Sequence, residues 1–379
     1  MLQNRLALSR SSPFGYHHPR GGKVQPLEAW IHANVALERV DSAHLRYNAI
    51  DHQAPQDLLG VYRAYDPERI YDWVDLTLIF AYLNALSTIG RILDIGTGDG
   101  WPALPLAPHV REVIGVDLSS VRVEVARENL ARFGYTNITF TIASGEDLPF
   151  SSNSFDGVVV GTAIEQMNDP RRCLAEIYRV LVPGGALIAT VEHLGAELSE
   201  EVSEQVEFFK RGNGFLYRYT VKEALPSREA EYQLFLHSSN DYSELLNEKA
   251  VSFPSRLGFV RRAGEPGARA LADDIKKAYG LSFLKEIAEM IDQGQYFELD
   301  HFDLLTLKET LEAVGFSEVK ICGRITQAAH RFFIDLNERG TLKGLHSHFE
   351  SICAALATLW PLIPPQDESV LFIRSRRGK

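Results

Sequence analysis

The stretch from Arg91 to Gly100 reads RILDIGTGDG and decides the fold of this chain. Its apolar run, Ile92 to Ile95, lacks the polar face of a half-buried strand and is typical of a strand buried on both sides in a parallel sheet. Glycine then recurs at positions 96, 98 and 100, which permits positive φ angles and a close approach of the backbone to a ligand. Asp94 lies where the strand becomes the loop, at the edge where open α/β sheets bind ligands.

The spacing of these glycines separates two kinds of nucleotide-binding loop. The dinucleotide fingerprint G-x-G-x-x-G would place its third glycine at position 101, where this chain has Trp101. The pattern is instead D-x-G-x-G-x-G, from Asp94 to Gly100. At this point the chain resembles the class I S-adenosylmethionine-dependent methyltransferases.

Apolar strand patterns and amphipathic helix patterns alternate after this loop, as a parallel sheet requires. The expected strands are Glu112–Leu118, Ile138–Ile142, Val158–Val160, Ala186–Val191, Phe316–Ile325 and Ser369–Ile373. The sequence EIYRVLVPGG, which begins at Glu176, is close to that of menaquinone and ubiquinone C-methyltransferases. The resemblance implies a Rossmann-like seven-stranded methyltransferase sheet in an α/β fold, with its last strand antiparallel and inserted beside the fifth.

The same patterns divide the chain into four parts. These are an N-terminal helical region (1–88), the first part of the cofactor-binding core (89–193), an insertion (194–301) and the end of the core (302–379), which includes a second helical insertion at about 328–360. Helices are expected at Leu27–Val40 and Ile70–Leu86, and in the insertion at Leu198–Lys210 and Ala270–Asp292. We therefore predict a mostly helical insertion after the fifth strand, folded because structureless loops of this length are rare, and covering the substrate side of the site.

Two local features have no fixed place in this pattern. The segment from Trp101 to Val110 contains three prolines, so the helix there is expected to be short or irregular. An aromatic cluster precedes the first strand and packs in the core or, as the resemblance implies, covers the methionine end of the cofactor; it consists of Tyr62, Tyr65, Tyr71 and Trp73.

Composition excludes several classes of protein. The formal net charge of −11 over 379 residues argues against a nucleic-acid-binding surface, which normally carries a basic field. Three cysteines at wide spacing indicate neither a disulfide framework nor a zinc site, and no histidine cluster suggests a metal. The longest apolar stretches, Leu76–Leu86 and Ile352–Ile363, are too short to span a bilayer, and no signal-peptide core is visible. We expect a cytoplasmic protein, with the basic, acid-poor N-terminus as a solvated tail or an organelle transit peptide.

The resemblance implies a set of residues that contact S-adenosylmethionine. Asp94 would hold the methionine amino group through the loop, Asp117 the ribose hydroxyls, and Leu118 would pack on the adenine. The remaining members of the set are Gly96, Thr97, Gly98, Gly100, Ser144, Gly145, Glu146 and Thr162. Ser144 stands where the family usually has an aspartate, so either Ser144 or Glu146 would accept a hydrogen bond from the adenine amino group.

A catalytic base is needed only if the methyl acceptor must lose a proton. The two candidates are His193, at the end of the fifth strand, and Glu165, in the loop after the fourth. A structural or solvated role for His193 is the simpler interpretation, because one histidine at a strand end has many uses.

Three functions remain open on the sequence. The first is methyl transfer to a small, partly apolar organic acceptor; the loop GTAIEQ, which begins at Gly161, lacks the D/N-P-P-Y motif of adenine and glutamine N-methylation. The second is methylation of RNA or protein with the insertion as recognition module. The third is non-catalytic binding of S-adenosylmethionine. The sequence does not define an oligomeric state.

Overall fold

The computed structural model describes residues 24–48, 63–192, 202–211, 214–224, 227–237, 279–302, 304–365 and 370–378. The chain forms two compact units. The core unit comprises Asp41–Glu197 and Leu299–Lys379, and the insertion unit comprises Met1–Val40 and Leu198–Glu298. The N-terminal region is therefore shared between the units, with its boundary at position 40.

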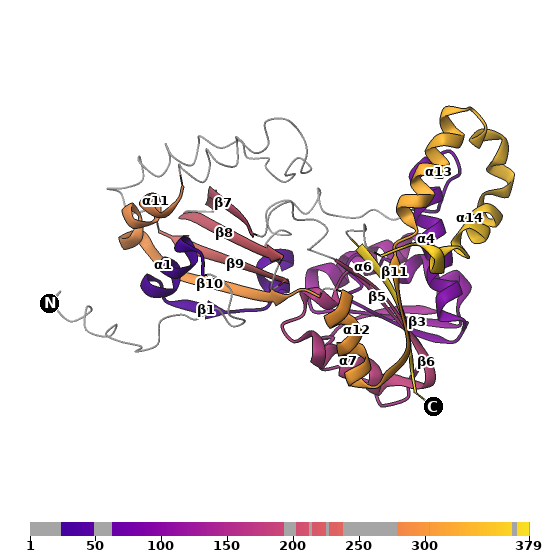
Figure 1. The fold of residues 1–379 in the computed structure, drawn as a ribbon, viewed down its shortest axis with the longest axis horizontal. Coiled ribbons are helices and arrows are strands. Elements are labelled where there is room, and N and C mark those ends of the chain that lie inside the picture. Colours follow the sequence, from indigo (N-terminus) through magenta and orange to yellow (C-terminus); the bar gives the residue numbers. More distant parts are fainter. Residues whose placement is uncertain are drawn as a thin grey trace. The chain divides into compact units, whose positions relative to one another are not determined.

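The core unit contains a seven-stranded sheet of order β11-β12-β6-β5-β2-β3-β4 (Figure 1). Its strands are β2 (Arg91–Ile95), β3 (Glu112–Asp117), β4 (Ile138–Ile142), β5 (Phe155–Gly161), β6 (Leu181–Glu192), β11 (Phe316–Gly323) and β12 (Val370–Arg377). Neighbours among β2 to β6 pair in parallel. Strand β12 pairs antiparallel with both β6 and β11. The predicted methyltransferase sheet is confirmed, including the antiparallel strand beside the fifth.

Two apolar clusters cover the two faces of this sheet. Helices α4 (Ile70–Leu86), α5 (Ala103–Leu106) and α6 (Ser120–Phe133) contribute to one cluster. The other cluster includes side chains of α7 (Pro170–Val180) and α12 (Leu304–Val314). Ile92 of β2 belongs to the first cluster and Leu93 to the second, which is why this strand has no polar face. The segment after the glycine loop is short, as its prolines predict: α5 is only four residues long.

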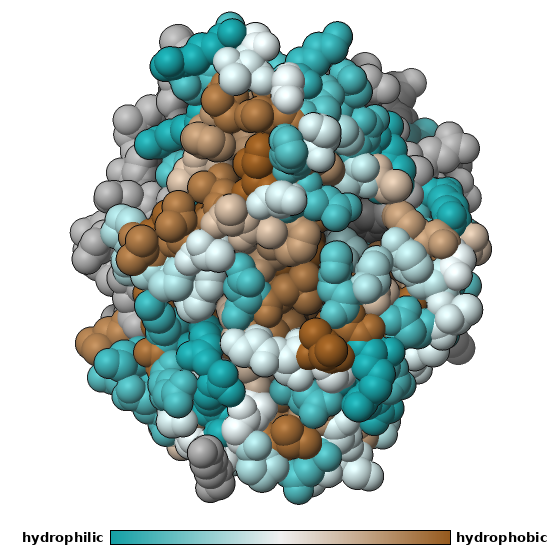
Figure 2. Space-filling view, turned by 90° about the vertical axis from the view of Figure 1, so that its right-hand side faces the viewer, coloured by the Kyte–Doolittle hydropathy of each residue, from teal (hydrophilic) through white to brown (hydrophobic). Residues whose placement is uncertain are grey.

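The second insertion forms α13 (Thr326–Glu338) and α14 (Phe349–Ala357), with short helical turns η5 (Leu342–His348) and η6 (Trp360–Leu362). These helices pack against α4 around Trp73, which is fully buried beside Phe333 and Phe349. Figure 2 shows apolar side chains gathered in a band on the face of the molecule that presents these helices. None of the helices in the described ranges is both long enough and apolar enough to cross a membrane.

The insertion unit contains a five-stranded sheet of order β1-β10-β9-β8-β7 (Figure 1). Its strands are β1 (Leu37–Arg39), β7 (Val202–Arg211), β8 (Gly214–Ala224), β9 (Ser227–Leu236) and β10 (Ile291–Asp300). Strands β7, β8 and β9 are antiparallel neighbours. The prediction of a mostly helical insertion is wrong for the described residues, because Leu198–Lys210 falls largely on β7.

Side-chain alternation explains this correction. Val206 and Phe208 of β7 pack in the unit's core together with every second residue of β8 from Phe215 to Val221, a period of two rather than 3.6. In the predicted helix Ala270–Asp292, only α11 (Leu281–Glu286) and the short turn η4 (Ala288–Met290) are helical in the described part. The predicted helix Leu27–Val40 is also shorter than expected: α1 (Pro26–Asn34) ends before β1 begins.

Candidate functional site

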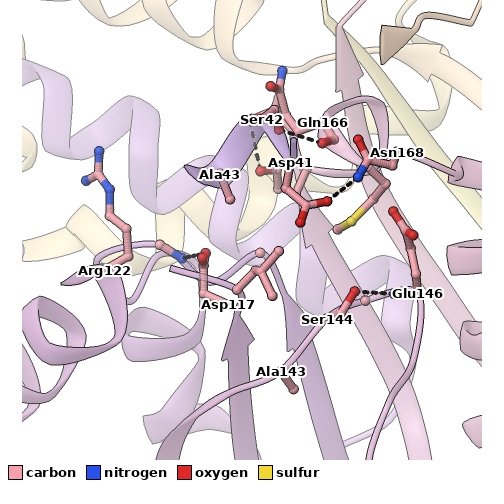
Figure 3. A pocket seen from close by; sticks show the side chains of 18 residues that line it. Asp41, Ser42, Ala43, Asp117, Arg122, Ala143, Ser144, Glu146, Gln166 and Asn168 are labelled. Atoms are coloured by element: carbon pink, nitrogen blue, oxygen red, sulfur yellow. Dashed lines mark hydrogen bonds between the residues drawn. The ribbon is translucent and has the colours of Figure 1, made fainter. Parts of the chain in front are cut away.

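A pocket of about 210 Å³ lies at the carboxyl ends of β2, β3, β4 and β5 in the core unit (Figure 3). Of the residues expected to contact a cofactor, eight line it: Gly96, Gly98, Asp117, Leu118, Ser144, Gly145, Glu146 and Thr162. Three others, Asp94, Thr97 and Gly100, do not line it. Open α/β sheets bind ligands at the carboxyl ends of their strands where the strand order reverses, which in this sheet is between β2 and β5. The topology and the side chains therefore indicate the same place.

The glycine loop is shaped by its backbone hydrogen bonds. The amides of Gly96 and Thr97 both donate to the carbonyl oxygen of Val116, at 2.8 and 3.0 Å, which turns the chain sharply after β2. Gly96 has a φ of +70°, and a Cβ there would lie 2.3 Å from the Cβ of Ala163. Gly98 has a φ of +52° and nothing within 4 Å of a Cβ position. The loop therefore presents bare backbone to the pocket at Gly98, as a cofactor that needs close backbone approach requires.

Asp117 ends β3 and is held by two backbone donors. The Gly98 amide donates to Oδ2 at 2.9 Å, and the Ser119 amide donates to Oδ1 at 2.8 Å. Burial raises the pKa of Asp117, while these two hydrogen bonds act in the opposite direction. A carboxylate fixed at a strand tip on the pocket wall is the arrangement that accepts hydrogen bonds from ribose hydroxyls in Rossmann-like sheets.

Asp94 supports the loop from behind and does not face the pocket. It is fully buried, and its Oδ2 accepts a hydrogen bond of 2.6 Å from the Thr97 hydroxyl. Burial raises the pKa of Asp94 to about 8, against the opposing hydrogen bonds from Thr97 and the backbone of Ala103. Any effect of Asp94 or Thr97 on a bound cofactor would therefore pass through the conformation of the loop.

The opposite wall of the pocket is formed by the turn after β4. The Ser144 hydroxyl accepts from the Glu146 amide at 3.1 Å, and Glu146 in turn accepts from the Asp169 amide at 3.1 Å. A Cβ on Gly145 would lie 2.8 Å from Ile95 and 2.9 Å from Met167, so only glycine lets this turn pack so closely. Leu118 is 42% exposed and also lines the pocket, which places an apolar side chain next to these polar groups.

Thr162 begins the loop that follows β5. Its φ of +50° is rare for a β-branched residue, and its amide is bonded to the carbonyl of Thr190 at 2.9 Å. Strained backbone of this kind persists where the surrounding structure fixes it and is concentrated at functional sites.

The segment Asp41–Ala43 lines the same pocket, which the sequence analysis did not predict. Figure 3 shows Asp41 and Ser42 bonded to residues of the loop after β5. The Ser42 hydroxyl donates to the carbonyl of Gln166 at 2.8 Å, and Asn168 donates to the Asp41 carboxylate. No glycine motif or apolar period marks this segment, so only the tertiary structure could reveal its position.

Of the two candidate bases, the structure describes Glu165 but not His193. Glu165 lies in the short turn η3 (Ile164–Gln166), is fully buried, and accepts a hydrogen bond of 3.0 Å from the backbone amide of Glu192. It does not line the pocket, and this contact fits a role in fixing the loop to the end of β6. His193 lies outside the described residues. In the described ranges, no group of three or more acidic, histidine or cysteine side chains could hold a metal ion.

The aromatic cluster before β2 is divided in the structure. Trp73 packs in the core, Tyr71 is 67% exposed and stacks on His330, and Tyr65 lines a separate cavity. Tyr62 lies outside the described residues. Neither Tyr65 nor Tyr71 lines the pocket at the glycine loop.

Comparison with known proteins identifies the family. A family model described as a methyltransferase domain matches residues 93–189. The ubiquinone/menaquinone biosynthesis C-methyltransferase UbiE of Geotalea daltonii is 38% identical over 174 residues, which cover 45% of this chain and 66% of that protein. The demethylmenaquinone methyltransferase of Clavibacter sepedonicus is 31% identical over 177 residues, covering 46% of this chain and 64% of that protein. The chain thus spans slightly less than two thirds of the length of these two relatives.

A third relative is covered more fully. The UbiE protein of Geobacter sulfurreducens is 38% identical over 216 residues, which cover 53% of this chain and 77% of that protein. These matches agree with the strand order of the core sheet and with the glycine loop and Asp117 at its carboxyl edge. The chain belongs to the class I S-adenosylmethionine-dependent methyltransferases.

Proposed function

We propose that this protein transfers a methyl group from S-adenosylmethionine to a small, partly apolar organic acceptor such as a phenol or quinol. The observation that carries the proposal is the pocket itself: bare backbone at Gly98, a fixed carboxylate at Asp117 and an apolar surface at Leu118 meet at one sheet edge. The names of the relatives that act on quinone precursors support the acceptor class.

The residues of the chain would have distinct tasks in this reaction. The cofactor supplies a methyl group on a positively charged sulfur, so the protein needs no metal to activate it. Asp117 would accept hydrogen bonds from the ribose, Leu118 and Met167 would enclose the adenine, and Gly98 would allow the backbone to approach. Correct positioning of the two reactants can supply roughly 7–11 kcal/mol of the barrier reduction.

The direct test is calorimetric titration of the full chain with S-adenosylmethionine, with two variants that alter the pocket in different ways. Asp117→Ala removes the proposed ribose contact, and Leu118→Ser removes apolar surface at a position that is already 42% exposed. We expect about tenfold to hundredfold weaker binding for Asp117→Ala, because a charged hydrogen-bonding partner fixed by two backbone amides is lost. We expect about threefold to tenfold weaker binding for Leu118→Ser.

Leu362→Ser is the matched control, since Leu362 is 75% exposed and does not line the pocket. Its affinity should equal that of the wild type. Unchanged affinity in Leu118→Ser, a variant whose folding is not at risk, would remove this pocket as the cofactor site. If the wild type binds but forms no S-adenosylhomocysteine with a panel of phenols and quinols, the proposed acceptor class is wrong.

A further inference from the structure

The core unit contains a second, larger cavity that the proposed function does not use. Its volume is about 450 Å³, within the range of roughly 300–1,000 Å³ that is usual for small-molecule sites. It lies between α4, the segment before it, the short α5, the end of α6 and the start of α14. Its aromatic lining residues are Tyr65, Phe80, Trp101, Phe133, Tyr135 and Phe349.

Two unusual features of this sequence create the cavity. Pro105 and Pro108 line it, and α5 ends after four residues, because proline within a helix removes a hydrogen bond and clashes with the preceding turn. The second insertion supplies Phe349 and Glu350 from α14 on another side. Phe80 of α4 remains partly exposed between them and packs near His109, with ring centres 5.6 Å apart.

The charges in this cavity are unevenly paired. The Arg69 guanidinium is bonded to the Asp72 carboxylate and to the carbonyl of Ala64, so these two charges neutralise each other. Asp75 and Glu350 also line the cavity, and neither forms an ion pair with another described residue. The side chain of Asp75 is exposed, but partial withdrawal from water and the neighbouring Asp72 raise its pKa, while the charge of Arg324 acts in the opposite direction. A cation placed near Asp75 would relieve this like-charge repulsion.

We propose that this cavity binds an organic cation with an apolar body, such as an aromatic amine or a quaternary ammonium compound. Aromatic faces attract such cations through their negative quadrupole, and the attraction grows when the cation is withdrawn from water. The carboxylates of Asp75 and Glu350 add opposite charge from two separate helices, α4 and α14. Arg63, also in the lining, makes an anion the competing ligand, which the experiment below decides.

Trp101 lies between this cavity and the pocket at the glycine loop. Its ring lines the larger cavity, and a Cβ built on Gly161, which lines the pocket, would lie only 3.1 Å from the same ring. Binding in the larger cavity does not itself depend on methyl transfer.

The probe is benzyltrimethylammonium, titrated calorimetrically into the full chain with and without saturating S-adenosylhomocysteine. The added S-adenosylhomocysteine fills the glycine-loop pocket, so that heat from the probe reports the larger cavity. Asp75→Asn and Glu350→Gln remove one charge each while keeping the shape. We expect each to weaken binding by about twofold to fivefold, the size usual for one opposite-charge contact of an exposed carboxylate.

Asp335→Asn is the matched control, because Asp335 is an acid on α13 that pairs with Arg339 and does not line the cavity. It should bind the probe like the wild type. Phenylacetate, an anion of similar size, should bind at least about tenfold more weakly than benzyltrimethylammonium. Equal or tighter binding of phenylacetate, no binding of the cation at millimolar concentration, or unchanged affinity in both Asp75→Asn and Glu350→Gln would overturn the proposal.

Discussion

The two sheets of this protein place their buried charges differently. In the core sheet, the carboxylates of Asp94 and Asp117 stand at the carboxyl end of their strands, where loop amides and a hydroxyl bind them. In the insertion sheet, Arg228 lies on β9 and is only 1% exposed. The core sheet thus keeps one of these carboxylates, that of Asp117, on the wall of the pocket, whereas the insertion sheet uses charge inside its own structure.

The network around Arg228 joins segments that are far apart in sequence. Arg228 pairs with Glu28 of α1 at 2.5 Å, with Glu223 of β8 at 3.9 Å, and with Glu298 of β10. The Tyr232 hydroxyl donates to Glu28 at 2.7 Å. Burial alone would raise the pKa of Glu28, but the hydrogen bond and charge of Arg228 hold it below its ordinary value. This buried network links a helix and a strand whose bonded residues are 200 positions apart in the chain.

The largest expected effect comes from breaking this network. Arg228→Met should destabilise the insertion unit by about 3–5 kcal/mol, because it leaves buried carboxylates without their counter-charge. Hydrogen exchange of peptides from β8 and β9, followed by mass spectrometry, measures the effect within that unit. Arg339→Met, which breaks an exposed pair with Asp335, should cost less than about 1 kcal/mol. Equal effects of the two substitutions would show that the buried network does not stabilise the unit.

A smaller effect is expected from the glycine loop of the core unit. Gly96→Ala should cost about 3 kcal/mol, because it combines the strain of a positive φ with a Cβ placed 2.3 Å from that of Ala163. Gly134→Ala is the matched control: Gly134 has nearly the same φ, +68°, but nothing within 4 Å of a Cβ. It should cost about 1 kcal/mol. Hydrogen exchange of β2 and β3 peptides compares the two, and similar costs would mean that the contact with Ala163 is relieved without strain.

The two units should also respond to pH in opposite directions. The pKa of Asp94 is raised in the folded state, to about 8, so its contribution to stability is complete below about pH 4 and is lost as the pH rises toward 8. The pKa of Glu28 is lowered, so its contribution is present above its unfolded pKa and is lost on acidification through its folded pKa.

The measurement is the free energy of local opening in each unit between pH 5 and pH 8. Core peptides of the wild type should lose up to about 1 kcal/mol per pH unit, and Asp94→Asn should flatten that slope. Insertion-unit peptides should show no such loss over this range. A core slope that is the same in Asp94→Asn as in the wild type would assign the pH dependence to another group, such as Asp117, whose pKa is also raised.

The core sheet and most of its pocket could be predicted because their signals are local. Three glycines in five residues and an acid at the end of β3 are short patterns with one structural explanation. Asp94 and Thr97 show the limit of such patterns. Their spacing places them at the loop but does not decide whether their side chains line the pocket. The structure shows that they do not line the pocket and are hydrogen-bonded to each other.

The prediction of a helix at Leu198–Lys210, where the structure has β7, is wrong because two signals conflict in this segment. The segment before Lys210 contains Glu200, Glu201, Glu204 and Glu207, and glutamate is a good helix former. The alternation of Val206 and Phe208 with Gln205 and Glu207 indicates a strand, but Phe209 interrupts this alternation after a few residues. Pairing with β8 decided between them, and that pairing is a tertiary contact.

The sequence by itself determined the parallel core sheet, its glycine loop and the acid at the tip of β3, because each depends on the conformational needs of residues adjacent in the chain. Only the tertiary structure decided that Asp41–Ala43 closes one side of the pocket, that Arg228 meets acids from three elements, and that Trp101 separates two cavities. These contacts join residues distant in sequence, and their energies come from burial and charge pairing, which no local pattern records.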